Sequence, residues 1–340
     1  MSFNVNKLNI LYETPIEYLP SMSRELGIQL YIKRDDLTPL GAGGNKLRKL
    51  EYLVQDAMDK GATMLITVGG GQTNHGRQTA AMAAKYGMKC AILAVDAYPG
   101  ELSANMLLDR LFGCELYLKK SDGRPDSVQL DELVETVTRK YEAQGEKVYF
   151  IPMGGSNVLG ALGYYDCAVE LDRQAKELGI PRARVIDTVG SMGTYAGLYC
   201  GLKNIKSDLH LTGIAILPFG EKNFTNLEKY LNDVKDTYGM DIDVTRDDID
   251  IETGYVRGGY NLESREVRNA IELMGAKEGL VLDPCYTGKA MAGIMDMVFE
   301  GKISQGEDVI FIHTGGMPGI YTPHHRLWFD RELGDGVHIL

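Results

Sequence analysis

The chain has 340 residues, of which 44% are apolar and 24% charged, which is ordinary globular composition and enough chain for about two domains. This composition excludes intrinsic disorder, collagen and coiled coil. The net charge of −11 argues against nucleic acid as a partner and against attraction to anionic membranes. No apolar stretch approaches the roughly 18 residues of a membrane span.

The cysteines and the first residues indicate the compartment. The five cysteines are odd in number, lie far apart and form no CxxC pair, so we expect reduced thiols, no disulfide scaffold and no structural zinc or other metal site. The first segment, MSFNVNKLNILYETP, has no basic stretch followed by an apolar one. We therefore expect a cytoplasmic protein.

Short apolar runs alternate along the chain with longer helical patterns. The expected strands are 29–32, 64–68, 90–95, 148–151, 185–189, 209–217 and 309–312. One expected helix begins near residue 45, and the others cover 74–86, 130–144, 158–178, 194–203 and 288–299. Apolar strands alternating with such helices predict the α/β class, with mostly parallel sheets covered by helices. In such sheets ligands lie beyond the carboxyl ends of the strands.

The first of four glycine-rich segments, KRDDLTPLGAGGNKLRK, leads into a helix at Asn45, a residue type that favours the N-cap position. An apolar face predicts this helix, through Leu47, Leu50, Leu53, Val54, Ala57 and Met58. Its first turn carries Lys46 and Lys49. A helix start carries partial positive charge, so two lysines there are misplaced unless they meet an anion or act chemically. Two ordinary surface lysines are the alternative.

Three further glycine-rich segments have the small and hydroxylated residues that suit anion contact. VGGGQTNHGRQ and VGSMGTYAG each join a strand to a helix, whose exposed amides could hold a carboxylate or a phosphate. LDPCYTGK and HTGGMP, taken together, add phenol and hydroxyl groups. Neither a P-loop nor a GxGxxG spacing is present. The segments together predict a site for an anionic, phosphorylated small molecule beside an unusual lysine, whereas any single segment could serve tight packing alone.

Six ordered motifs resemble one enzyme family. GGNKLRKLEYL, GQTNHGRQTAAMAAKYG, IPMGGSNVLGALGY, GSMGTYAGL, LDPCYTGKAMAG and IFIHTGG resemble the D-cysteine desulfhydrase and 1-aminocyclopropane-1-carboxylate deaminase family, between about residues 14 and 323. This resemblance implies a fold-type II enzyme dependent on pyridoxal 5'-phosphate. It also implies two open, twisted, mostly parallel sheets flanked by helices, with the cofactor in the cleft between a large domain (1–49 plus 161–340) and a small one (50–160). Family members commonly form homodimers.

The resemblance also implies roles for single residues. Lys46 matches the lysine that binds the cofactor aldehyde covalently and later transfers protons. Lys49 matches a lysine near the cofactor phosphate, and Asn74 matches the asparagine bonded to the cofactor 3-oxygen. The phosphate loop matches Gly190, Ser191, Met192, Gly193 and Thr194.

The substrate side of the site is implied in the same way. Thr73 stands where the family usually has a serine next to the substrate, so it is expected to be a catalytic residue that contacts the substrate. Its extra methyl is expected to narrow the space for the substrate. Gln72, Asn74 and His75 line the same turn and are expected to contact the substrate. Tyr286 and Tyr260 match two catalytic phenols, although GGYNLES around Tyr260 departs from the family pattern. Buried structural tyrosines are the alternative for both.

Two threonines distinguish the activities within this family. Members that open the cyclopropane ring carry glutamate at the position of Thr287 and leucine at that of Thr314. A carboxylate at the cofactor's ring nitrogen makes a stronger electron sink than a hydroxyl. The threonines therefore favour β-elimination, with D-cysteine giving pyruvate, ammonia and hydrogen sulfide.

Three alternatives stay open at this stage. They are L-cysteate sulfo-lyase, with sulfonate donors from Arg77, His75 or Arg257, then 1-aminocyclopropane-1-carboxylate deaminase, and a non-catalytic protein that only carries the cofactor.

Overall fold

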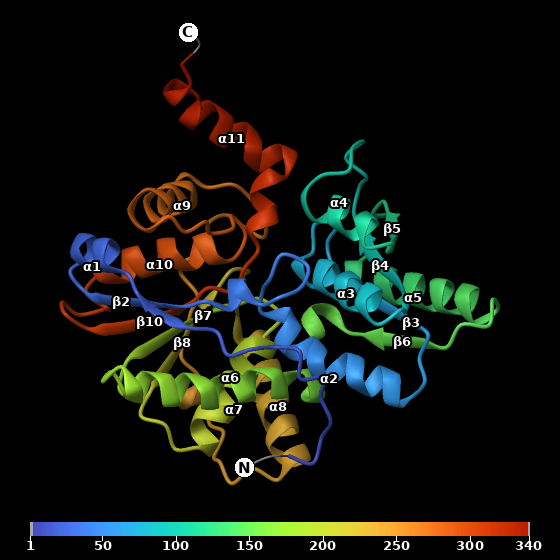
Figure 1. Ribbon diagram of the computed structural model, residues 1–340, viewed down its shortest axis with the longest axis horizontal. Helices are drawn as coiled ribbons and strands as arrows, with labels where there is room; N and C mark the ends of the chain where they lie inside the picture. Colours follow the sequence, from blue (N-terminus) through green and yellow to red (C-terminus); the bar gives the residue numbers. More distant parts are fainter. Residues whose placement is uncertain (1–2, 339–340) are drawn as a thin grey trace.

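The computed structural model describes residues 3–338 and contains two separate sheets (Figure 1). The larger sheet has six strands in the order β1-β2-β10-β7-β8-β9, and only the β1–β2 pair is antiparallel. Its strands are β1 (Ile16–Tyr18), β2 (Gln29–Lys33), β7 (Arg184–Val189), β8 (His210–Ala215), β9 (Ile251–Glu252) and β10 (Asp308–Ile312). The predicted α/β class with mostly parallel sheets is confirmed.

The smaller sheet is entirely parallel, with the order β5-β4-β3-β6. Its strands are β3 (Met64–Val68), β4 (Lys89–Val95), β5 (Glu115–Lys119) and β6 (Val148–Ile151). All five side chains of β3 are buried, as expected of a central parallel strand covered on both faces. This explains why β3 reads as an uninterrupted apolar run.

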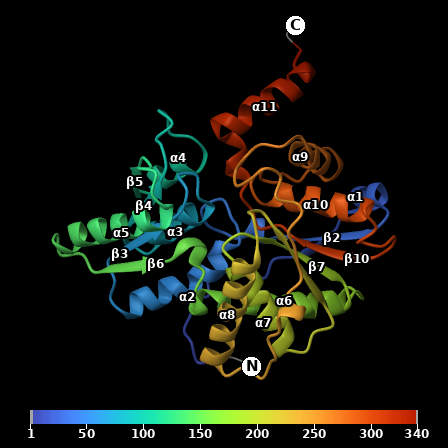
Figure 2. The same cartoon turned by 180° about the vertical axis from the view of Figure 1, so that it is seen from behind.

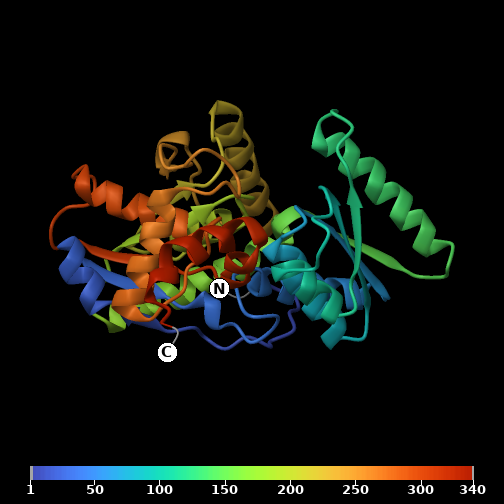
Figure 3. The same ribbon diagram turned by 90° about the horizontal axis from the view of Figure 1, so that it is seen from above.

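Helices cover both faces of each sheet. Figure 2 shows α6, α7 and α8 on one side of the larger sheet, and α1, α9 and α10 cover the other. The smaller sheet lies between α2 with α3 and, on its other face, α5, which Figure 3 shows at the outer edge of the molecule. The helices are α1 (Pro20–Leu26), α2 (Lys46–Asp59), α3 (Asn74–Lys85), α4 (Ala104–Leu111), α5 (Asp126–Glu142), α6 (Val158–Glu177), α7 (Gly193–Asn204), α8 (Glu221–Tyr238), α9 (Arg265–Glu278), α10 (Thr287–Phe299) and α11 (Pro323–Leu333).

The helices α2 and α6 connect the two sheets. Leu47, Leu50 and Leu53 of α2 pack in the core of the smaller sheet, as their spacing predicts. Met58 does not share this burial: its side chain is 41% exposed, whereas the neighbouring Ala57 is fully buried. The expected domain limits at 49/50 and 160/161 fall inside α2 and α6, so each helix continues across them.

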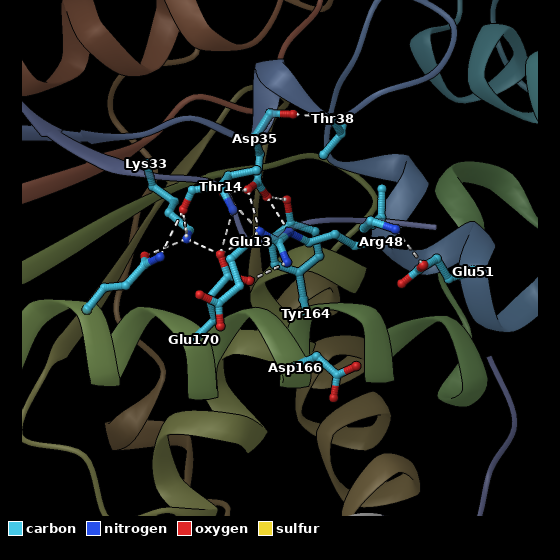
Figure 4. Close-up of polar contacts among 12 residues, drawn as sticks. Glu13, Thr14, Lys33, Asp35, Thr38, Arg48, Glu51, Tyr164, Asp166 and Glu170 are labelled. Carbon is cyan, nitrogen blue, oxygen red and sulfur yellow. Dashed lines mark hydrogen bonds and ion pairs between the residues drawn. The ribbon is translucent and has the colours of Figure 1, made fainter. Parts of the chain in front are cut away.

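A buried ionic network fixes the start of α2 against the larger sheet (Figure 4). Arg48 donates to Asp35 and Glu170 at 2.8 Å each, and Lys33 pairs with Glu170. Tyr164 of α6 also donates to Asp35. Two buried cations thus face two buried anions, which satisfies their charges away from water. The network places Lys46 and Lys49, on either side of Arg48 in the chain, at the junction of the two sheets.

Candidate active site

Lys46 opens α2 with its amine beside Asn45. Asn45 occupies the N-cap position, as expected, but it makes no side-chain cap bond, because its backbone is helical and its amide is used elsewhere. Its Oδ1 accepts from Lys46 Nζ at 2.8 Å, and its Nδ2 donates to the Thr194 hydroxyl at 3.0 Å. Burial lowers the pKa of Lys46 to about 8, with partial opposition from Asp187 and Asp283. About half of the amine is therefore neutral, and so able to act as a nucleophile, near pH 8.

Lys49 is fully buried beside the loop between β7 and α7. Its Nζ donates to the Gly154 carbonyl at 3.2 Å, and a Cβ on Gly193 would lie 2.9 Å from that Nζ. Burial and the neighbouring Lys46 hold the pKa of Lys49 well below its usual value. A bound anion would supply the missing partner of opposite charge and so favour the protonated form of this amine.

The loop from Gly190 to Thr194 forms a compact turn at the amino end of α7. Ser191 Oγ lies 2.9 Å from Ser156 Oγ, and a Cβ on Gly193 would come within 2.5 Å of the same Ser156 oxygen. Met192 adopts a left-handed backbone, with φ of 66°, which turns the chain into the helix. Two hydroxyls, the helix start and Lys49 together suit a phosphate group.

Sequence reasoning assigned no role to Ser156. The only sequence signal for it is its place in the IPMGGSN motif, because the residue reaches the loop from the distant segment between β6 and α6.

Thr73 caps α3, and its methyl lies inside the turn. The hydroxyl accepts from the Gly76 amide at 3.3 Å. A Cβ on Gly76 would lie 2.4 Å from the Thr73 methyl, and one on Gly69 would lie 3.1 Å from it. These two glycines make the room that the extra methyl needs. The methyl is thus accommodated between Gly69 and Gly76.

The other residues of this turn point in different directions. The side chain of Gln72 bonds to the start of α4, through Ser103 and Asn105. His75 is buried and lies 2.9 Å from the Thr67 hydroxyl, and burial with the nearby lysines lowers its pKa well below the usual value, so the ring is neutral. The predicted substrate contacts of Gln72 and His75 therefore compete with contacts inside the protein.

Tyr260 and Tyr286 form a hydrogen-bonded pair. Their hydroxyls lie 2.6 Å apart and their rings pack edge to face with centroids 5.9 Å apart. Desolvation raises the pKa of both phenols, although the Tyr260 side chain is 40% exposed, so both keep their protons at neutral pH. A Cβ on Gly190 would lie 3.5 Å from the Tyr286 ring, which places the pair against the phosphate-loop turn. The sequence spacing alone could not place Tyr260 there.

Asp283, which sequence reasoning did not single out, organises the first turn of α10. Its carboxylate accepts from the amides of Cys285, Tyr286 and Thr287, at 2.7 to 3.0 Å. It also accepts from the Thr287 hydroxyl at 2.7 Å. Four donors thus spread the negative charge of Asp283 over the helix start. The hydroxyl of Thr287 therefore both donates to the Asp283 carboxylate and accepts from the Asp283 backbone N–H, at 2.7 Å each.

The segment after β10 closes the site. The Thr314 carbonyl accepts from the Asn45 amide at 3.1 Å, which joins this segment to the start of α2. A Cβ on Gly316 would lie 2.8 Å from Asp283 and 3.0 Å from Asn74 Nδ2. Loops from both sheets therefore meet at the carboxyl ends of their parallel strands, where α/β proteins bind ligands.

The residues present fit pyridoxal phosphate. Lys46 supplies a reactive amine, the loop with Lys49 and Ser156 suits a phosphate, and Asn74 supplies an amide. Asp187 is fully buried with both oxygens unpartnered, and burial raises its pKa to about 7. An unpaired acidic group near Lys46 and Lys49 adds a site that can hold a proton where the cofactor would bind.

Other kinds of site find less support. Within residues 3–338, no group of three or more His, Cys, Asp or Glu side chains is arranged to hold a metal ion. In the same range, no helix is both long enough and apolar enough to cross a membrane.

Comparison with known proteins identifies the family. The sequence profile described as pyridoxal-phosphate dependent enzyme matches residues 8–315. A putative 1-aminocyclopropane-1-carboxylate deaminase of Pyrococcus abyssi is 41% identical over 314 residues, which cover 92% of each chain. A D-cysteine desulfhydrase of Salmonella newport is 38% identical over 317 residues, covering 92% of this chain and 94% of the relative.

The fold agrees with these relatives. The crystal structure of an ACC deaminase homologue superposes with a TM-score of 0.86 at 36% identity, covering 98% of this chain and 97% of the other. A fungal L-serine ammonia-lyase from Rhizomucor miehei, 18% identical with a TM-score of 0.66, shares the fold. The chain therefore belongs to the family of pyridoxal-phosphate-dependent enzymes, with fold type II, and is a lyase within it.

Proposed function

We propose that the enzyme eliminates the β-substituent of a small amino acid, with D-cysteine as substrate. Water and D-cysteine would give pyruvate, ammonia and hydrogen sulfide. The Cα–H, Cβ–S and Cα–N bonds are broken, and water supplies the ketone oxygen of pyruvate. The similarity to a D-cysteine desulfhydrase supports this reaction. The similarity to a putative 1-aminocyclopropane-1-carboxylate deaminase equally supports the competing reaction, deamination of the cyclopropane. The distinction between them must come from the site.

The hydrogen bonding of Thr287 carries the proposal. A neutral hydroxyl stands at the position expected to face the cofactor's ring nitrogen, and the nearest acid, Asp283, already accepts four hydrogen bonds. Thr287 therefore presents a hydroxyl, and not a carboxylate, to the ring nitrogen of the cofactor. Elimination of a thiolate tolerates this weaker electron sink, whereas opening a cyclopropane has no such leaving group.

The side chains divide the work of the reaction. Bound pyridoxal phosphate would withdraw electrons from the substrate Cα. Lys46 Nζ is placed to take the Cα proton, since its lowered pKa provides the neutral amine. The Tyr260–Tyr286 pair, protonated at neutral pH, can give a proton to the departing sulfur. Lys49 and Ser156, with the Gly190–Thr194 loop, would hold the phosphate.

The expected sulfonate donors of the L-cysteate alternative already make contacts inside the protein. Arg77 donates to the carbonyls of Gly41 and Gly43, and the neutral His75 bonds to Thr67. Arg257 pairs with Asp296. Each group is thus already partly bonded within the protein, although Arg77 Nε, Arg257 Nε and His75 Nδ1 have no partner among the described residues.

We further propose a homodimer in the cytoplasm. Figure 1 shows α11 projecting from the body of the protein, and its Leu327 and Leu333 are about half exposed, at 48% and 55%. Apolar side chains on a projecting helix favour a covering partner. The five free, buried cysteines suit a reducing compartment. Light scattering of the protein as it elutes from a size-exclusion column would give its molecular mass. The mass of a monomer would contradict the proposed homodimer.

The deciding experiment measures pyruvate release by the cofactor-loaded protein. D-cysteine, L-cysteine, L-cysteate and 1-aminocyclopropane-1-carboxylate are assayed in parallel, with 2-oxobutanoate followed for the last. We expect pyruvate and sulfide from D-cysteine, and none from the Lys46→Ala variant. Preference for L-cysteate would keep the elimination but change the leaving group. Turnover of the cyclopropane would defeat the argument from Thr287 and Thr314.

A further inference from the structure

The turn that carries Asn74 is tied to the first residues of α4. The backbone N–H of Asn105 donates to Gln72 Oε1 at 2.9 Å, and Gln72 Nε2 donates to the Ser103 carbonyl at 3.2 Å. The side chain of Asn105 is 1% exposed, and its Nδ2 lies 2.7 Å from the Gln72 carbonyl and 2.9 Å from Asn74 Oδ1. One buried amide thus links the backbone of the turn to the side chain of Asn74.

This linkage decides which way the Asn74 amide faces. A backbone carbonyl only accepts hydrogen bonds, so the atom of Asn105 next to the Gln72 carbonyl must be its NH2 group. The same NH2 group faces Asn74, so the nearer atom of Asn74 must be an acceptor, its Oδ1. The NH2 group of Asn74 therefore points away from α4.

The free NH2 group of Asn74 points toward the segment after β10. It lies 3.0 Å from where a Cβ on Gly316 would be, on the same side as Asp283. Glycine at 316 leaves this space open. The donor thus faces the edge of the larger sheet, where the loops of the site meet. With the opposite orientation, Asn74 would present a carbonyl oxygen here and would repel an anionic oxygen.

We propose that Asn105 is a positioning residue, which holds Asn74 so that its NH2 group donates to the phenolic oxygen of the cofactor. This inference rests on the proposed role of Asn74 as the partner of that oxygen. Asn105 itself would act only through Asn74. It also has one buried oxygen without a partner, Oδ1, so its amide is retained at the expense of an unsatisfied acceptor.

The test changes the donor at residue 105 and follows the bound cofactor. Asn105→Asp puts an acceptor against the Gln72 carbonyl and Asn74 Oδ1, and Asn105→Leu removes the polar group at similar size. Both variants should bind pyridoxal phosphate about tenfold more weakly, as the loss of one hydrogen bond to a charged oxygen predicts. The pH at which the visible absorption band titrates should rise by about one unit, because the unsupported oxygen holds a nearby proton more tightly.

Controls separate this role from general damage. Gln129 is another fully buried side-chain amide, and it lies in α5, a different helix that packs on the smaller sheet. Gln129→Leu should leave cofactor affinity and the pH titration of the absorption band unchanged. Thermal unfolding of each cofactor-free variant reports folding. If Asn105→Asp does not fold, Asn105→Leu carries the same prediction without adding a charge.

A double-variant cycle tests whether Asn105 acts through Asn74. In an Asn74→Ala background, Asn105→Leu should have no further effect on affinity or titration. An equal effect in both backgrounds, or wild-type titration by the folded single variants, would overturn the proposal. Failure of the proposed function is distinct, because it appears in the substrate assay of the unmodified protein and leaves the cofactor titrations of the variants unchanged.

Discussion

At the scale of single residues, the amine of Lys46 sets the pH at which the cofactor attaches. Burial lowers its pKa to about 8, and only the neutral amine attacks an aldehyde. The rate of attachment to cofactor-free protein should therefore rise about tenfold per pH unit below pH 8 and level off above it. Stopped-flow absorbance between about pH 6 and pH 10 measures this rate.

The matched variant for this experiment is Lys46→Ala. It should bind the cofactor without a covalent bond, so borohydride should trap none. Trapping in this variant would identify another lysine as the attachment site, and Lys49 would then be the first candidate.

At the scale of elements, the close crossing of α2 and α6 depends on Gly163. A Cβ at residue 163 would lie 2.2 Å from the Arg48 carbonyl oxygen, so α2 would have to move. Gly163→Ala should lower the free energy of unfolding by about 1–3 kcal/mol and weaken cofactor binding, since α2 carries Lys46 and Lys49. Urea unfolding and cofactor titration check both effects.

Gly275 provides the matched control for Gly163. It lies within α9 with open space at its missing side chain, so Gly275→Ala should stabilise the protein by about 0.5–1 kcal/mol. Equal effects of the two substitutions on cofactor affinity would show that the α2–α6 crossing does not position the lysines.

At the scale of the whole molecule, the network around Asp35 joins the larger sheet to both connecting helices (Figure 4). Burial opposes its charge, but Arg48, Lys33 and Tyr164 outweigh this and lower the pKa of Asp35 to about 2. Because this lies below the ordinary value of about 3.9, the charged group stabilises the fold above that pH. Its contribution, about 2 kcal/mol, should disappear as the pH falls from about 4 to about 2.

The variant Asp35→Asn tests this contribution. It leaves Arg48 without a full partner and should reduce the free energy of unfolding at pH 7 by about 3 kcal/mol. Its stability should also fall less steeply with acid. Asp122→Asn removes an exposed partner of Arg124 and should change stability by less than about 1 kcal/mol. A wild-type acid profile for Asp35→Asn would contradict the assignment.

The sequence predicted the buried elements well and the exposed ones poorly. The strand β3 matches its expected limits, and β10, α3 and α6 match within one residue, because continuous apolar runs and one-sided helices mark them. The edge strand β5, with charged ends, and the helix α8, with only Leu227, Leu231 and Val234 buried, were not predicted. A half-exposed element leaves too weak an apolar pattern to detect.

The candidate site divides in the same way. Lys46 and the phosphate-loop residues stand in local motifs, so a resemblance could mark them. Ser156, Asn105 and Asp283 were missed because their roles depend on contacts between segments far apart in the chain. The orientation of an amide, as at Asn74, is decided only when its neighbours are in place.

The position of β10 has a consequence for how the protein is made. This last strand inserts between β2 and β7, in the middle of the larger sheet. During synthesis the smaller sheet can assemble once residue 151 has left the ribosome, but the larger sheet must wait for residue 312. Until then, the edges of β2 and β7 that pair with β10 have no hydrogen-bonding partner. A nascent chain should therefore form no covalent, borohydride-trappable bond with pyridoxal phosphate until nearly its full length has emerged.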